Sequence, residues 1–161
     1  MTKFLLSVHV IAAILAIGPV AVAASMFPPA ARRALATGPD DDSGHEVHGG
    51  HDPDPTGTLR LLHRICRVYA VVGVVVPVFG FATASQMGVL GSAWLIVSIL
   101  LTALAALVLA ALVLPAQSAL LDGSAGTGRA ARLGMVTGLF NLLWAAVTVL
   151  MIVRPGSTTG A

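Results

Sequence analysis

Four long blocks of apolar residues, none containing a charged side chain, dominate the hydrophobic pattern of this chain. They cover residues 4–27, 68–87, 92–114 and 133–153 and are 20 to 24 residues long. At about 1.5 Å of rise per residue, each block would form a helix of about 30 to 36 Å, which matches the hydrocarbon core of a bilayer. The pattern predicts an all-α fold, a four-helix transmembrane bundle, in which residues 1–161 form a single integral membrane domain.

Proline interrupts two of these blocks. Gly18-Pro19 lies in the first block and Pro77 in the second. Because proline lacks the backbone N–H and its ring crowds the preceding turn, both helices are predicted to be kinked. The fourth block contains Gly134 and Gly138, a spacing that favours close approach of helix backbones. This contact is expected within the bundle, with dimerisation of two copies as the alternative.

A long polar loop over residues 28–67 is predicted between the first two helices. From Pro28 to Pro55 it is rich in Pro, Gly, Asp and His and has almost no large apolar residue after Leu35. Such a segment cannot bury enough apolar surface to fold without a partner. From Thr58 the pattern becomes helical, which predicts a short interfacial helix that leads into the second span.

Composition and charge narrow the class of protein. Of the 161 residues, 57% are hydrophobic and only 10% are charged, which excludes an ordinary soluble domain. The net charge is only +2, so a nucleic-acid partner is not expected. The excess of arginine over lysine and the abundant alanine favour a bacterium with a GC-rich genome, and therefore a bacterial plasma membrane.

The basic residues are distributed unequally between the two sides of the predicted bundle. Seven arginines fall in the connections 28–67 and 115–132, whereas Lys3 and Arg154 flank the opposite ends of the helices. Since basic residues near span ends favour the cytoplasmic side, these two loops are predicted to be cytoplasmic and both termini outside.

Histidines supply the candidate chemistry in the polar loop. His45, His48 and His51 recur at three-residue steps among several acidic residues. Neutral imidazoles in such a group suit zinc, copper or nickel. The loop glycines and the absence of a cysteine partner favour a solvated or partner-ordered loop instead, so the metal site remains the alternative hypothesis.

His9 is the only ionisable residue inside a predicted span, and such residues are costly in lipid and often functional. By helix rise it lies level with Ser98 and Thr148, which makes a structural hydrogen bond between helices the favoured interpretation. A quinone, proton or haem role is the alternative. Bis-histidine haem ligation within one chain is not expected, because His63 lies nearly a membrane thickness away.

No combination of nucleophile, base and orienting group can be assembled from the sequence, so the chain is predicted not to be an enzyme. Arg60, Arg64 and Arg67 share one face of the predicted interfacial helix. They are expected to contact anionic lipid headgroups or an acidic neighbouring subunit.

The opening Lys3-Phe-Leu-Leu-Ser-Val-His9-Val, the Gly18-Pro19 pair and the four spans with a long charged first connection resemble small four-helix membrane proteins of actinobacteria. In particular, the chain resembles the accessory factor of the respiratory supercomplex that joins cytochrome bcc to cytochrome c oxidase. The resemblance implies a non-catalytic subunit that supports assembly or stability, with haem and copper only in the partner subunits. The alternative is an independent membrane protein that binds a transition metal or small solute through its His-rich loop.

Overall fold

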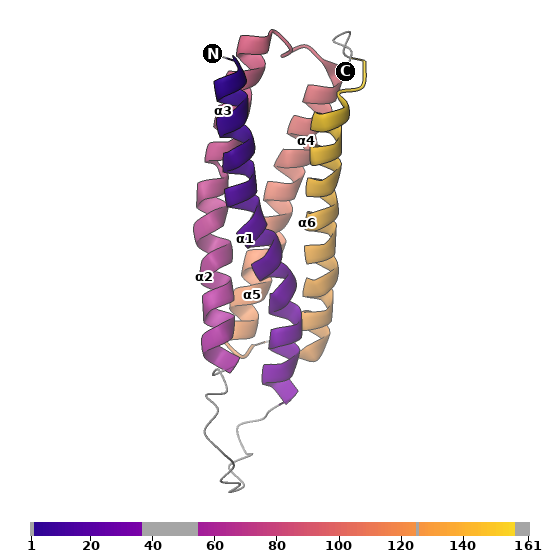
Figure 1. Ribbon diagram of the computed structural model, residues 1–161. Coiled ribbons are helices and arrows are strands. Elements are labelled where there is room, and N and C mark those ends of the chain that lie inside the picture. Colours follow the sequence, from indigo (N-terminus) through magenta and orange to yellow (C-terminus); the bar gives the residue numbers. More distant parts are fainter. Residues whose placement is uncertain (1, 37–54, 125, 157–161) are drawn as a thin grey trace, which may run out of the picture.

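In the computed structural model, the described residues are 2–36, 55–124 and 126–156, and all their regular elements are helical. The helices, labelled in Figure 1, are α1 (Thr2–Ala36), α2 (Pro55–Gly73), α3 (Val75–Met87), α4 (Ala93–Val108), the π-helical turn η1 (Leu109–Val113), α5 (Leu114–Leu121) and α6 (Thr127–Val153). They combine into four rods, because α2 and α3 are nearly continuous, as are α4, η1 and α5.

Each rod is long and apolar enough to cross a membrane. The four candidate spans are Lys3–Ala36, Pro55–Met87, Ala93–Leu121 and Thr127–Val153. The predicted all-α, four-span architecture is therefore confirmed, and the chain is a multi-pass membrane protein.

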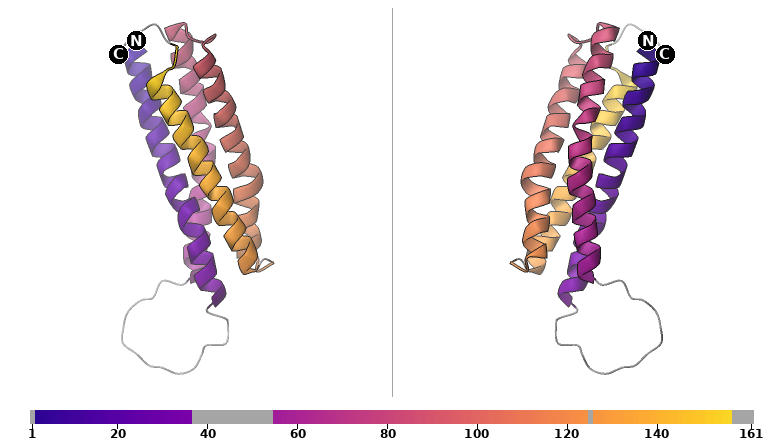
Figure 2. Two further views of the ribbon diagram at one scale, coloured as in Figure 1. Left: turned by 90° about the vertical axis from the view of Figure 1, so that its right-hand side faces the viewer. Right: turned by 90° about the vertical axis from the view of Figure 1, so that its left-hand side faces the viewer.

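The rods lie side by side in sequence order around the bundle (Figures 1 and 2). α1 contacts α2, α3 and α6, while α4 and η1 contact α6, and α5 contacts α2 and α6. This arrangement creates two unlike ends. We call the end that holds the last turns of α1, all of α5 and the first turns of α2 and α6 the arginine end. The terminal end is where α1 begins, α3 meets α4 and α6 finishes.

The helices at the arginine end extend further than predicted. The loop edge expected at Pro28 is wrong, because α1 continues through Pro28 and Pro29 to Ala36. α2 begins at Pro55, three residues before the helical start expected at Thr58. The expected connection 115–132 is likewise mostly helical, since α5 reaches Leu121 and α6 begins at Thr127. Packing explains the extension of α1: Phe27 and Ala31 are buried in one cluster with Leu59 and Leu62 of α2.

The second rod contains the interruption expected near Pro77. α2 ends at Gly73 and α3 begins at Val75, and the Val74 N–H bonds to the Val71 carbonyl in a tighter turn. Without an N–H on Pro77, the Gly73 carbonyl lacks its usual helical donor, which accounts for the break. α1, in contrast, continues through Gly18-Pro19 as one helix.

A π-helical turn over Leu109–Val113 lies just before Pro115 in the third rod. In a regular α-helix the Pro115 ring would crowd the Ala111 carbonyl. The wider turn accommodates the proline, and the helix continues to Leu121 instead of ending at the predicted boundary, Leu114.

The main hydrophobic core lies between the middle of the bundle and the arginine end. Its largest fully buried apolar side chains are Phe27, Phe140, Leu133 and Val113. A smaller cluster at the terminal end joins Ala84 of α3 to Trp94 and Leu95 of α4. The Arg154 guanidinium lies 5.8 Å from the Trp94 ring centroid, a cation–π contact that links the end of α6 to the start of α4.

Candidate functional site

His9 is buried between α1 and the start of α3. Its Nδ1 atom lies 3.1 Å from the carbonyl oxygen of Val76, which immediately precedes Pro77. A carbonyl oxygen can only accept a hydrogen bond, so Nδ1 carries the hydrogen and donates it. The histidine thus ties the first rod to the second next to the interruption at Val74.

Gly80 provides the space for the His9 ring. A Cβ atom added to Gly80 would lie 2.8 Å from His9 Cε1 and 3.2 Å from His9 Nδ1. Contacts that short do not occur in relaxed structures, so any side chain at Gly80 would force the imidazole to move. The glycine and histidine therefore form a matched pair across the α1–α3 contact.

Ser98 and Thr148, which helix rise places at the depth of His9, bond within their own helices. The Ser98 hydroxyl donates to the Trp94 carbonyl at 2.8 Å, and the Thr148 hydroxyl donates to the Trp144 carbonyl at 2.9 Å. Such bonds to the residue four positions earlier satisfy a hydroxyl without a partner helix. The hydrogen-bonding partner of His9 is consequently a backbone group of α3 and not either of these side chains.

A second polar cluster is enclosed at the arginine end. Gln117 of α5 is fully buried, and its side chain bridges two residues of α2. His63 Nδ1 lies 3.1 Å from Gln117 Oε1, and Gln117 Nε2 donates to Cys66 Sγ at 3.5 Å. Since the amide oxygen is an acceptor, His63 is the donor in the first bond. The amide uses both of its ends to join α5 to α2.

A third polar region lies in an open groove of about 310 Å³ between α1 and α6. Ser25, Pro28, Pro29 and Arg32 line it from α1, and Gly134, Thr137, Gly138 and Asn141 line it from α6. Asn141 Nδ2 donates to Ser25 Oγ at 3.0 Å, which joins the two helices across the groove. A Cβ added to Gly134 would lie 3.8 Å from Pro28 Cβ, an ordinary van der Waals distance that agrees with the expected contact inside the bundle, whereas a Cβ on Gly138 would meet nothing within 4 Å.

This groove has unsatisfied hydrogen-bonding capacity. Thr137 Oγ1 and Asn141 Oδ1 are buried without a hydrogen-bond partner, as is Trp144 Nε1 one turn further along α6. In addition, Pro28 and Pro29 have no N–H, so the carbonyls four residues earlier on α1 lack their usual helical donors. Unpaired polar atoms are expensive where lipid tails are the solvent.

The arginines gather at one end of the bundle. Arg60, Arg64 and Arg67 are exposed on α2, and none of them lines the groove between α1 and α6. His45, His48 and His51 lie outside the described residues. Within residues 2–36, 55–124 and 126–156, no group of three potential metal ligands is found.

Sequence reasoning identified His9 but missed Gln117 and Thr137. Gln117 lies in a stretch that was assigned to a loop, so its burial was not anticipated. A glutamine two residues after a proline, in the mostly apolar stretch from Leu114 to Leu121, was the available signal.

The class of protein follows from this architecture: a four-span integral membrane protein with buried polar contacts between its helices. Comparison with protein-family models, with curated proteins and with solved structures gave no match.

Proposed function

We propose that this chain is a non-catalytic accessory subunit that supports the assembly or stability of a respiratory electron-transfer complex in a bacterial plasma membrane. The resemblance of its first residues and four-span layout to the accessory factor of the cytochrome bcc and cytochrome c oxidase supercomplex supports the respiratory setting. Haem and copper belong to the partner subunits in this proposal, and the chain itself holds no cofactor.

The observation that carries the proposal is the polar groove between α1 and α6. Thr137 and Asn141 lie about 8 and 14 Å along the helix axis from Arg132, well inside the hydrocarbon region if that arginine marks its edge. Acyl chains cannot satisfy these groups. Because the two oxygens are buried in this chain alone, a polar side chain of a partner helix would have to enter the groove to reach them. The uncovered surface at Gly138 would allow the backbone of that helix to approach closely.

The other polar contacts support a structural role. The His9 ring is held by Val76, and the Gln117 amide is used by His63 and Cys66. Cys66 is fully buried, so a substrate could not reach its thiol. These groups are committed to holding helices together, which fits a subunit that contributes contacts and not chemistry.

Photo-crosslinking tests the proposed partner surface directly. A benzophenone amino acid at Gly138 should crosslink to a membrane subunit of the respiratory complex, whereas the same group at Leu104, on the exposed face of α4, should give little product. Equal labelling from the two positions would contradict a specific partner surface at the groove.

Affinity purification tests the function itself. A tag after residue 161 should recover a large, coloured, cytochrome-containing particle in mild detergent, and deletion of the gene should weaken that assembly without changing the haem and copper spectra of its catalytic subunits. Recovery of the chain alone, colourless and with stoichiometric bound metal, would favour the alternative of an independent metal-binding protein.

The orientation is part of the proposal: the arginine end faces the cytoplasm and the terminal end faces outward. All seven arginines of the predicted cytoplasmic loops lie at the arginine end or in the helices that lead to it, in line with the charge bias of membrane proteins. A membrane-impermeant thiol reagent added to intact cells should label Gly91→Cys, where a side chain meets nothing within 4 Å, but not Ser124→Cys. The reverse pattern would overturn the orientation.

The exposed arginines of α2 are proposed to contact anionic headgroups or an acidic neighbouring subunit. Native mass spectrometry of the Arg60→Ala/Arg64→Ala/Arg67→Ala variant should show fewer bound lipids or a lost partner. An unchanged spectrum would leave these residues with interfacial anchoring only.

A further inference from the structure

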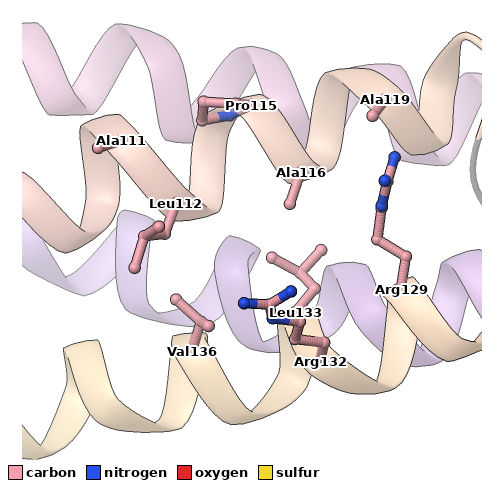
Figure 3. Close-up of a pocket in the computed structure, with 9 residues that line it drawn as sticks. All are labelled: Ala111, Leu112, Pro115, Ala116, Ala119, Arg129, Arg132, Leu133 and Val136. Carbon is pink, nitrogen blue, oxygen red and sulfur yellow. The ribbon is translucent and has the colours of Figure 1, made fainter.

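A second groove, of about 350 Å³, lies between the third and fourth rods at the arginine end (Figure 3). Its lining is apolar apart from two arginines: Arg129 lies at one end beside Ala119, and the Arg132 guanidinium extends toward the middle of the groove on the side of Val136 (Figure 3). The lining residues are Ala111, Leu112, Pro115, Ala116, Ala119, Leu133 and Val136 together with Arg129 and Arg132. From Ala111 to Ala119 the groove extends about 12 Å along the helix axis, the length of a substantial part of an acyl chain.

The two arginines have no anionic partner in the part of the chain that the structure describes. Both are exposed, and both come from the first two turns of α6. Figure 3 shows Arg129 reaching from α6 across the groove toward Ala119 on α5. Asp122 is the one carboxylate among the described residues, and it forms no ion pair with either arginine.

The local backbone adds to the positive potential at this end of the groove. α6 begins at Thr127, and its N-cap residue, Gly126, provides no side-chain hydrogen bond to the first turn. The free N–H groups of a helix start favour an anion. The start of α6 and the two exposed guanidinium groups give this part of the groove a positive charge, while the other lining residues are apolar.

We propose that this groove binds one anionic phospholipid, with the phosphate of its headgroup at Arg129 and Arg132 and one acyl chain along Ala111, Ala116 and Val136. The sequence of charged and apolar surfaces along the groove indicates that the bound molecule is a phospholipid. A charged end lies where headgroups are found, and an apolar channel continues from it toward the membrane interior, as in basic pockets between transmembrane helices. This inference does not depend on the proposed respiratory function.

The arginines of α2 differ in this respect. Arg60, Arg64 and Arg67 are exposed on a helix surface and line neither this groove nor the one between α1 and α6, so we expect them to attract anionic lipids through diffuse charge. A lipid at Arg129 and Arg132 has an apolar channel as well as a charge, and it should therefore remain bound when the surrounding lipids exchange. A lipid in the groove is therefore recognised by its retention on the protein, whereas lipids attracted by the α2 arginines are only enriched around it.

The test uses the full-length protein in nanodiscs, transferred to detergent and measured by native mass spectrometry. Phosphatidylglycerol should be retained at one molecule per chain, and phosphatidylcholine should not. Arg129→Gln/Arg132→Gln should lower the affinity for phosphatidylglycerol by about 30-fold, as expected for the loss of two cationic contacts at an anionic surface. Arg60→Gln/Arg64→Gln removes the same charge from the same end and should leave the retained lipid in place.

A third variant separates the channel from the charge. Ala116→Phe fills the groove without altering either arginine, and it should also abolish retention. Arg129→Lys/Arg132→Lys keeps the charge and should retain lipid, which provides a folded reference if the glutamine pair is unstable. Equal losses in the two Arg→Gln pairs, retention by Ala116→Phe, or displacement of the lipid by millimolar inorganic phosphate would each overturn the proposal.

Discussion

The two ends of the bundle are held together in different ways. At the arginine end, large apolar side chains such as Phe27 and Leu133 are fully buried, and Gln117 is enclosed among them. At the terminal end, the core cluster is limited to Ala84, Trp94 and Leu95, and most large apolar side chains face outward. There the rods are joined by a few individual contacts, including His9 to Val76 and Arg154 to Trp94.

Solvent accounts for one part of this difference, the burial around the projecting end of α1. α1 contains 35 residues and is therefore about 52 Å long, well beyond the roughly 30 Å of a hydrocarbon core. Its apolar block starts near the terminal end, so the excess length projects at the arginine end. Helices in water gain free energy by burying apolar groups, but helices in lipid gain little from doing so. The core at the arginine end includes residues of the projecting part of α1, such as Ala31, and continues to the depth of Phe140, whereas the terminal end relies on directional contacts.

The largest effect is expected from removing a core side chain at the arginine end. Phe27→Ala should lower the free energy of unfolding by about 3 to 5 kcal/mol, because a fully buried aromatic ring would be replaced by a cavity. Unfolding of the purified protein in mixed micelles with increasing SDS provides the measurement. Phe81→Ala, at a ring that is 61% exposed, is the matched control and should change little. Equal losses for both variants would remove the contrast between the two ends.

A smaller loss is expected at the terminal end from Gly80→Ala. The new Cβ would collide with the His9 ring and break its bond to Val76, at a cost of about 1 to 3 kcal/mol. Gly18→Ala, where an added Cβ meets nothing within 4 Å, is the control and should be neutral or slightly stabilising.

The collision can be separated from other effects by a double-mutant cycle. In a His9→Ala background, Gly80→Ala should cost much less than it does in the wild type, because the ring that it strikes is gone. Full additivity of the two changes would show that His9 and Gly80 are not energetically linked.

The smallest effect concerns the single polar bridge inside the well-packed end. Gln117→Leu should cost about 0.6 to 2 kcal/mol, since the shape is nearly kept while His63 loses its hydrogen-bond acceptor. The same SDS titration on Gln117→Leu, His63→Ala and the double variant measures the coupling between the two residues. If the coupling is zero, the bridge contributes nothing to the stability of the arginine end.

The sequence predicted the parts of this fold that depend on composition and missed the parts that depend on packing. The four apolar blocks, the break near Pro77 and the clustering of arginines were all evident. The extension of α1 was not, because Pro28-Pro29 is ordinarily a stop signal and its effect is outweighed by burial of Phe27 and Ala31 against α2.

The polar contacts also divide into those that the sequence pattern reveals and those that depend on how the helices pack. His9 was recognised because an imidazole is unusual in an apolar block, but its partner is the Val76 carbonyl, and backbone groups leave no mark on a sequence pattern. Ser98 and Thr148 were predicted as its hydrogen-bonding partners because only side chains at the same depth were compared. Gln117 was missed because its direction depends on the helical turn that precedes it.

The π-helical turn over Leu109–Val113 sets the direction in which every later side chain of the third rod points. A π-helical turn contains one residue more than the α-helical turn it replaces, so Leu109–Val113 advances the following helix by about 100° relative to an uninterrupted α-helix. Deleting a single alanine there, such as Ala110, would restore ordinary α-helical winding and keep the span long enough for the membrane. It would also turn Gln117 away from His63 and Cys66 and swing Ala116 and Ala119 out of the groove beside α6. The single inserted residue therefore orients both Gln117 in its bridge to α2 and the α5 alanines that line the groove beside α6.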